Sequence, residues 1–291
     1  MCRWFAYLSP TEPSLLEDTL INPANSLSRQ VHDHYLPQLI SHDPKDLKDA
    51  DHLTTARNSI YNIDGLGVAW YTTSYADSEL KNTGQSSDGQ QAEGLWPAVY
   101  KTEMSEAAFG AINGGTDSEH LAALYLTYLT KNGGPETFAT TYSIEEMEKA
   151  MHMTVATLIA TQKRILGPKA APNSLNLCAT DGTRLIAYRF RNHATQQPPS
   201  LYYSTKAGTT LNRKYPDHPD GKDVPGRMEG RDVGEHGKHL IVASEPSTYI
   251  AEEWVLVGKN QVILADPRTK TFEVRDMRYE EGWDVEDPMA V

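Results

Sequence analysis

The chain has few cysteines, an excess of acidic over basic residues and no long apolar segment. Its 291 residues include only two cysteines, Cys2 and Cys178, which argues against a disulfide scaffold and fits a reducing compartment. Lysine and arginine number 27 against 39 aspartates and glutamates, a formal charge of −12, so nucleic acid and anionic membranes are not expected as partners. No apolar run approaches the roughly 18 residues that a membrane-spanning helix needs. The first residues also lack the apolar core of a signal peptide. We therefore expect a cytoplasmic protein.

The sequence also lacks the usual cofactor-binding patterns. It contains no Gly-x-Gly-x-x-Gly and no phosphate-binding loop, so no nucleotide cofactor is implied. The ten histidines are scattered, and the close pair His32 and His34 has no third ligand nearby. Cys178 lies in an apolar, strand-like run, where a thiol usually packs as a small apolar group. We therefore expect neither a cofactor nor a metal.

What the chain does contain is a pattern of strands at both ends with helices between them. Asp181-Gly182, between two apolar runs, predicts a hairpin. The segments Thr116–Glu119 and Ser143–Glu146 each have the form of a capping box at the start of a helix, and another helix is expected around 15–20. The expected strands cover 2–8, 67–71, 96–100, 174–179, 184–188, 201–204, 239–243, 254–257, 261–264 and 271–275. This order predicts an α+β fold with antiparallel sheets covered by helices.

The composition along the chain predicts a single domain over residues 1–275. Residues 72–94 are polar and hold few apolar side chains, which is typical of a solvated surface insert. Residues 206–238 are polar and rich in glycine and proline, so we expect a long loop there. Residues 276–291, which include the run Glu280–Asp284, are expected to form a solvated acidic tail.

The dipeptide Met1-Cys2 is the most informative feature of the chain. Methionine aminopeptidase removes Met1 before a small residue, which would leave Cys2 with both a thiol and a free α-amine. The pKa of an α-amine is about 8 and that of a thiol about 8.5, so the amine can take the thiol proton and activate the nucleophile. The aromatic and aliphatic residues behind Cys2 predict a strand that holds the terminus in a sheet. The alternative is that Cys2 simply packs, and the dipeptide alone does not decide between them.

Further short blocks along the chain extend this pattern. The blocks are Met1–Arg3, Asn62–Ala69, Gly115–His120, Asn176 with Asp181–Thr183, Tyr202–Gly208 and Val242–Pro246. In this order they resemble the class II glutamine amidotransferases, which are N-terminal-nucleophile hydrolases with an αββα four-layer sandwich. Within that family the chain is most similar to the fungal amidotransferase subunit of glutathione degradation and to the γ-glutamyl-hercynylcysteine-sulfoxide hydrolase.

The resemblance implies a chemistry for Cys2. Its thiolate would attack the γ-carboxamide of glutamine or of a small γ-glutamyl compound, and its α-amine would shuttle the proton before the γ-glutamyl thioester is hydrolysed. By the same resemblance Asp117, next to Thr116, would bind the α-ammonium group of the substrate. An aspartate in the first turn of a helix also complements the helix dipole, so this role remains one of two interpretations.

The block around residue 65 is expected to be structural. Gly65 and Gly67 allow a tight turn and a close approach of the backbone to the nucleophile. Asn62 either orients a polar group or forms a turn.

The chain departs from the family between Asn62–Ala69 and Gly115–His120. The family carries a His-x-Arg-x-Ala strand, an Asn-His-Pro-Phe segment and a His-Asn-Gly turn there, and none of the three occurs in this sequence. The Asn-Gly pair of that turn supplies the oxyanion hole, and losing one oxyanion donor costs about 10²–10³ in rate. Asn113-Gly114 and Asn132-Gly133 lie in turn-like contexts and are not expected to replace it.

These absences predict an incomplete fold and an impaired hydrolase. The alternative is a non-catalytic subunit or pseudoenzyme of the same fold that binds a peptidase-like partner. A third possibility is an N-terminal-cysteine acylase of the penicillin- or bile-salt-hydrolase kind, against which the Thr116–Glu119 block argues.

Overall fold

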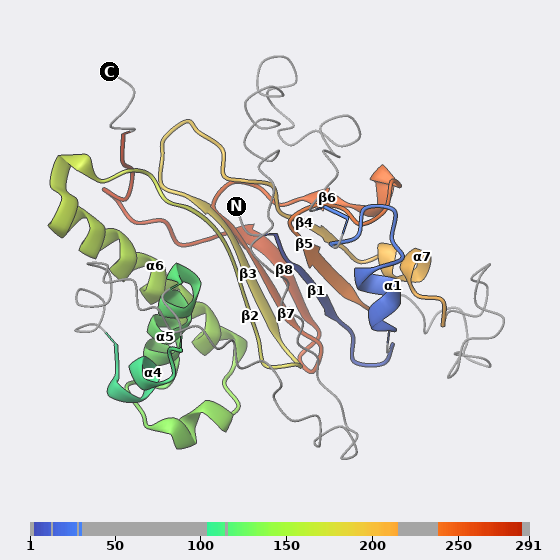
Figure 1. Cartoon of the computed structure of the whole chain (residues 1–291), viewed down its shortest axis with the longest axis horizontal. Helices are drawn as coiled ribbons and strands as arrows, with labels where there is room; N and C mark the ends of the chain where they lie inside the picture. The colour runs from blue at the N-terminus through green and yellow to red at the C-terminus, as the bar shows by residue number, and fades with distance from the viewer. Residues whose placement is uncertain are drawn as a thin grey trace. The chain divides into compact units, whose positions relative to one another are not determined.

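The computed structural model describes residues 3–12, 14–27, 29–30, 104–113, 116–214 and 238–286. These residues fall into two compact units, which we describe each by itself (Figure 1). The sheet unit contains the described residues of 1–67 and 172–287, and the helix unit contains those of 68–171. The strands expected at 67–71 and 96–100 and the insert 72–94 lie outside the described residues.

The sheet unit contains two antiparallel sheets of four strands each, as the described residues show. One sheet has the order β1-β5-β4-β6 and the other the order β2-β3-β7-β8. The strands of the first are β1 (Phe5–Leu8), β5 (Leu240–Ala243), β4 (Tyr202–Ser204) and β6 (Val255–Leu256). Those of the second are β2 (Ser174–Thr180), β3 (Leu185–Arg191), β7 (Gln261–Asp266) and β8 (Thr271–Asp276). Every neighbouring pair is antiparallel, which confirms the expected sheet type.

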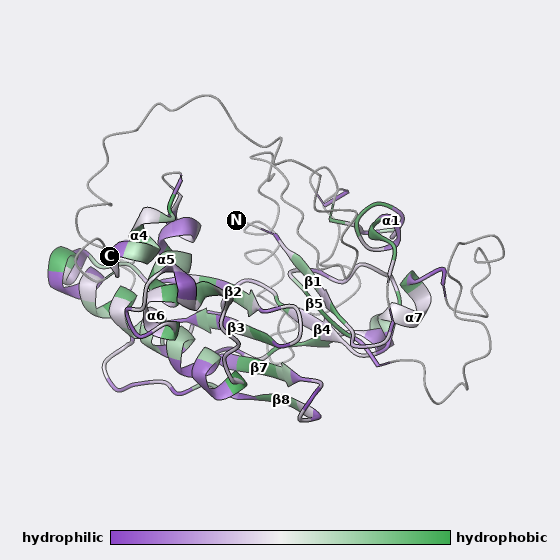
Figure 2. Cartoon of the chain, turned by 90° about the horizontal axis from the view of Figure 1, so that it is seen from below, coloured by the Kyte–Doolittle hydropathy of each residue, from purple (hydrophilic) through white to green (hydrophobic). Residues whose placement is uncertain are grey.

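A common apolar core joins the two sheets. Its buried residues come from strands of both sheets and their flanks: Leu8, Leu185, Ala187, Leu201, Leu240, Val242, Val257, Ile263 and Ala265. Successive side chains of a strand point to opposite faces. Accordingly Ala6 and Leu8 of β1 belong to this core, whereas Phe5 and Tyr7 pack on the other face of their sheet with residues of α7 (Ala207–Leu211). Figure 2 shows how apolar the strands are.

The Asp181-Gly182 hairpin between β2 and β3 forms as expected. Asp181 Oδ1 accepts the backbone N–H groups of Thr183 at 2.9 Å and Arg184 at 2.6 Å. Gly182 has a φ of +82°, which suits glycine because it has no Cβ. The Arg184 guanidinium then binds Asp181 Oδ2 at 2.6 Å and Asp266 Oδ2 of β7 at 2.8 Å, so the turn is tied to the neighbouring strand.

The helix unit contains α4 (Glu106–Gly110), α5 (Asp117–Leu129) and α6 (Ile144–Leu166), with short 3₁₀ turns at Pro135–Ala139 and Gly167–Lys169. The capping box of α6 is confirmed, because Ser143 and Glu146 each accept the other's backbone N–H. The apolar residues on one face of α6 are buried: Ile144, Met147, Met151, Val155, Leu158 and Ile159. α5 and α6 are joined by a hydrogen bond of 2.6 Å between Tyr128 Oη and Thr157 Oγ1.

Two segments near the sheet unit's surface differ from expectation. Within the segment 206–238, expected to be a loop, residues 207–211 form the helix α7. The described part of the expected acidic tail is not simply solvated, since Met277 and Trp283 are buried. The Trp283 ring lies 5.9 Å from that of Phe190 in β3, and its carbonyl accepts the side-chain N–H of Asn192 at 3.1 Å. The charged composition of this segment gave no sign that one of its aromatic side chains is buried.

The helix expected around 15–20 is confirmed as α1 (Leu16–Leu20). A 3₁₀ turn covers Ala251–Glu253.

Candidate functional site

Arg3 and Trp4, which follow Cys2 in the chain, are held by the segment that follows β5. Arg3 Nε lies 3.3 Å from Glu245 Oε1. The Trp4 backbone N–H donates to Ser244 Oγ at 3.0 Å, and the Ser244 N–H donates to the Trp4 carbonyl at 3.0 Å. Two of the sequence blocks, Met1–Arg3 and Val242–Pro246, therefore meet although they lie about 240 residues apart.

A third block joins them through the indole of Trp4. Trp4 Nε1 donates to the carbonyl oxygen of Asn176 in β2 at 3.1 Å. The Asn176 side chain donates in turn to the carbonyl of Ser200 at 2.7 Å. The block Tyr202–Gly208 supplies β4, which pairs with β5. The start of β1 is thus the place where four of the blocks come together.

Two residues that nothing in the sequence singled out complete this environment. Arg3 Nη1 donates to the carbonyl of Gln30 at 2.7 Å, and the Gln30 side chain donates to the carbonyl of Asn25 at 3.0 Å. Asn25 Nδ2 donates to the carbonyl of Pro246 at 2.7 Å, and its backbone N–H donates to that of Ser247 at 3.2 Å. We call Arg3, Asn25, Gln30, Glu245 and Ser247 the Arg3 cluster.

The Arg3 cluster is buried and leaves several acceptors without a donor. Asn25, Gln30 and Ser247 are 1%, 5% and 1% exposed. Among the described residues, Asn25 Oδ1, Gln30 Oε1 and Ser247 Oγ have no hydrogen-bond partner. Burial also raises the pKa of the Glu245 carboxyl, against the opposing effect of the Arg3 guanidinium. The cluster is therefore an acceptor-rich, partly unsatisfied polar site beside the start of β1.

Several of the expected site residues lie outside the described residues. These are Cys2, Asn62, Gly65 and Gly67. Thr116 and Asp117 are described, in the helix unit. Thr116 Oγ1 caps α5 by accepting the N–H of Glu119 at 3.3 Å, and Asp117 is the exposed first residue of that helix. The hydroxyl of Ser118 donates to Asp117 Oδ1 at 3.3 Å.

The pair Asn132-Gly133 serves the end of α5, as its turn-like context predicts. Asn132 has a φ of +63°, and its N–H donates to the carbonyl of Thr127 at 3.0 Å. In Asn113-Gly114, Asn113 donates its backbone N–H to the Glu119 carboxylate at 3.1 Å, whereas Gly114 lies outside the described residues. Asn113 and Asn132 therefore make hydrogen bonds at the start and at the end of α5, respectively.

Within the described ranges, no cluster of three or more histidine, cysteine, aspartate or glutamate side chains is suited to hold a metal ion. Among the same residues, none of the helices combines the length and the apolar character required to cross a membrane.

The chain is similar to a glutamine amidotransferase over about half of its length, which agrees with the resemblance that its motifs predict. The probable glutamine amidotransferase DUG3 of Saccharomyces cerevisiae is 26% identical over 161 residues, which cover 54% of this chain and 42% of that protein. The chain thus spans less than half the length of this relative. No family model matches the chain. A solved structure, a glutamine aminotransferase class-II domain protein from Silicibacter pomeroyi, is 15% identical with a TM-score of 0.43, covering 64% of this chain and 62% of its own.

Proposed function

We propose that the chain is a cytoplasmic glutamine amidotransferase-like hydrolase, impaired by the absence of the His-Asn-Gly turn, that cleaves the γ-glutamyl amide or peptide bond of a small γ-glutamyl compound. Cys2, exposed as the N-terminal residue by removal of Met1, would be the nucleophile. The proposal includes the αββα four-layer arrangement, to which the two face-to-face antiparallel sheets correspond. Degradation of glutathione or of a related γ-glutamyl compound is the process to which such an activity would belong.

The observation that carries the proposal is the meeting of the sequence blocks at Arg3 and Trp4. A nucleophile at a chain terminus must be held by its neighbours, because free termini otherwise fray. Here the two residues that follow Cys2 make hydrogen bonds or ion pairs to Ser244, Glu245 and Asn176. The relationship to the glutamine amidotransferases supports the same interpretation.

The proposed reaction has two steps. In the first, the α-amine of Cys2 takes the thiol proton, and Sγ attacks the γ-carbonyl carbon of the substrate. The C–N bond then breaks, the leaving nitrogen receives the proton, and a γ-glutamyl thioester remains. In the second, water attacks the thioester carbon, the C–S bond breaks and the thiol is restored. Asp117, whose helix Thr116 caps, is proposed to bind the α-ammonium group of the substrate.

The first experiment is an intact-mass measurement before and after exposure to a diazo-ketone analogue of glutamine. The expected result is loss of Met1 and one adduct that maps to Cys2. The matched control is the variant Cys178→Ala, because burial raises the pKa of the Cys178 thiol to about 12 and removes it as a nucleophile at neutral pH. Cys178→Ala should label as the original chain does, and Cys2→Ala should not label.

A folded protein that has lost Met1 and takes no adduct would contradict the hydrolase. The absence of the His-Asn-Gly turn from the sequence favours the second candidate in that case. This is a non-catalytic subunit of the same fold that binds a peptidase-like partner, and its binding would be unaffected by Cys2→Ala.

A further inference from the structure

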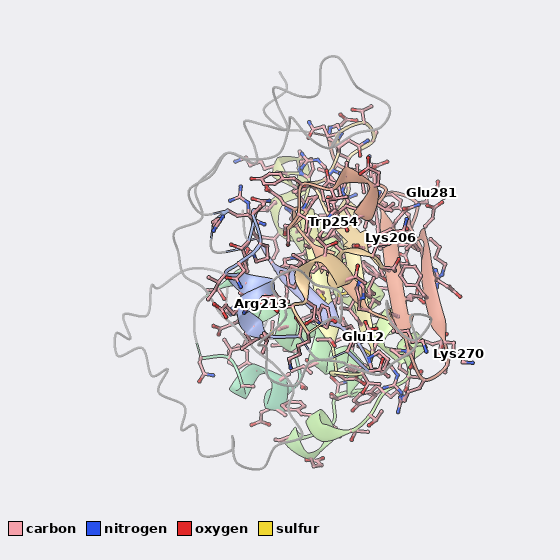
Figure 3. The ribbon with its side chains drawn as sticks, turned by 90° about the vertical axis from the view of Figure 1, so that its right-hand side faces the viewer. Glu12, Lys206, Arg213, Trp254, Lys270 and Glu281 are labelled. Carbon is pink, nitrogen blue, oxygen red and sulfur yellow. The ribbon has the colours of Figure 1, made fainter. Side chains whose placement is uncertain are left out.

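A buried acid–base pair lies at the other end of β1 and β5, away from Arg3. The pair consists of Glu12 and His239, whose side chains are both 0% exposed. His239 Nδ1 lies 3.3 Å from Glu12 Oε2, and the other carboxylate oxygen accepts the backbone N–H of Lys238 at 3.3 Å. Glu12 is labelled in Figure 3. Neither residue takes part in the proposed reaction.

The hydrogen bonds of the ring determine where its proton lies. The backbone N–H of Gly208, in α7, donates to His239 Nε2 at 2.8 Å. A nitrogen that accepts a hydrogen bond carries a lone pair, so the proton of the neutral ring is on Nδ1 and is donated to Glu12. The contacts therefore select the neutral form of His239.

The surroundings favour the same form. The Tyr7 ring stacks on the His239 ring with centroids 6.0 Å apart and an interplanar angle of 7°, and the Tyr7 hydroxyl donates to the Glu12 carbonyl at 2.8 Å. Burial lowers the pKa of His239, while the carboxylates of Glu12 and of Glu253, in the 3₁₀ turn, oppose the shift without cancelling it. The polar groups around the pair therefore include these two carboxylates, the Tyr7 hydroxyl and the backbone N–H of Lys238, which donates to Glu12.

The contact between α7 and the His239 ring leaves no room for a side chain at position 208. A Cβ atom on Gly208 would lie 2.5 Å from His239 Cδ2 and Nε2, closer than a Cβ atom comes to a non-bonded heavy atom. The helix therefore reaches the ring through a bare backbone N–H, and this hydrogen bond depends on the unprotonated state of Nε2.

We propose that the Glu12–His239 pair is a proton-sensitive latch that holds α7 on the sheet β1-β5-β4-β6. A proton taken from solvent adds to Nε2, which then turns a donor toward the Gly208 N–H, and the hydrogen bond is lost. No covalent bond other than the new N–H changes, and the imidazolium stays beside the Glu12 carboxylate. Acid thus releases α7, and neutral pH restores it.

The latch reaches beyond α7 because the residues after this helix are tied to α1. Arg213 Nε binds Asp18 Oδ1 at 2.5 Å, and Arg213 Nη2 binds Glu17 Oε2 at 2.7 Å. Figure 3 shows Arg213 beside the α1 ribbon. Release of α7 would therefore loosen α1 as well, and it would uncover Phe5 and Tyr7, which pack against a cluster that includes Ala207 and Leu211 of α7.

The sign of the pH dependence follows from the neutral buried ring. The released state binds a proton with the ordinary histidine pKa of about 6.5, whereas the latched state binds it only at lower pH. Opening should therefore grow by up to tenfold for each pH unit below about 6.5, until the lower pKa of the latched state is reached. Above pH 6.5 it should not depend on pH.

The test is amide hydrogen exchange of residues 207–212 between pH 5 and 8, expressed as protection factors of the full chain. In the original chain, protection of α7 should fall as the pH falls, while the β2–β3 hairpin stays protected. His239→Gln can both accept from Gly208 and donate to Glu12 but does not titrate, so its α7 protection should be independent of pH. His193→Gln is the matched control, because His193 is also buried and accepts backbone N–H groups at Nδ1. It should keep the response of the original chain.

The same pH response in His239→Gln as in the original chain would overturn the latch. So would constant protection of α7 across the range in the original chain. If His239→Gln does not fold, ¹⁵N chemical shifts of the His239 ring in the original chain replace it. A ring that stays neutral with its proton on Nδ1 well below pH 6.5 supports the latch, and an ordinary titration near 6.5 with α7 protected overturns it.

Discussion

At the scale of single residues, the Arg3 cluster combines well-paired and unpaired polar atoms. A buried ion pair gains little over apolar packing, yet removing one partner leaves the other uncompensated at a cost of about 3–5 kcal/mol. The Arg3–Glu245 pair comes close to this case, since it is partly buried, with the two side chains 13% and 6% exposed. Each buried acceptor that lacks a donor costs about 1–3 kcal/mol more. Local stability is therefore low around Arg3, just before β1 begins, a feature common at functional sites.

Two serines of the same segment should respond in opposite ways to alanine. Ser244→Ala removes the acceptor of the Trp4 N–H, so we expect the free energy of unfolding to fall by about 1–3 kcal/mol. Ser247 Oγ is buried and has no hydrogen-bond partner among the residues that the structure describes, so Ser247→Ala should leave stability unchanged or raise it. Urea unfolding followed by circular dichroism measures both. Equal losses in the two variants would contradict the assignment of these hydroxyls.

At the scale of secondary-structure elements, the signals that sequence carries well are local ones. The hairpin at Asp181-Gly182 and the helix start at Ser143 were predicted because the residues that form each contact lie within a few positions. The contacts that build the candidate site are of another kind. Arg3 and Glu245 are 242 positions apart, and Glu12 and His239 are 227 apart. Only the family resemblance indicates that the blocks containing Arg3 and Glu245 belong together. Nothing in the sequence indicates that Glu12 and His239 meet.

The capping box of α6 offers a prediction at this scale. Ser143→Ala removes the acceptor of the Glu146 N–H at 3.2 Å, and we expect about 1 kcal/mol of stability to be lost. Ser143→Asp restores a capping oxygen and should recover most of it. Ser118→Ala, an exposed serine within the first turn of α5, is the control and should change stability by less than about 0.5 kcal/mol. Helical ellipticity during thermal unfolding is the measurement, and a loss that Ser143→Asp does not recover would argue against capping.

At the scale of the whole chain, segments from both of its ends belong to the sheet unit. β1 pairs with β5, and the residues after β8 return to β3. There the Trp283 ring packs against the rings of Phe190 and Tyr279, with centroids 5.9 and 5.3 Å away, and Val285 donates its N–H to the Asn192 carbonyl at 3.0 Å. A segment of acidic composition thus acts as part of the fold because one aromatic side chain anchors it.

Removing that anchor should destabilise the sheet unit as a core mutation does. Trp283→Ala deletes a side chain that is 6% exposed, and replacing a buried tryptophan by alanine costs about 3–5 kcal/mol. Glu281→Ala, two positions away and exposed, should change the free energy of unfolding by less than about 0.5 kcal/mol. Urea unfolding of the two variants distinguishes a packed segment from a solvated tail. In a solvated tail, neither substitution would change the free energy of unfolding. A large loss for Trp283→Ala alone would mean that the segment after β8 is packed as part of the sheet unit.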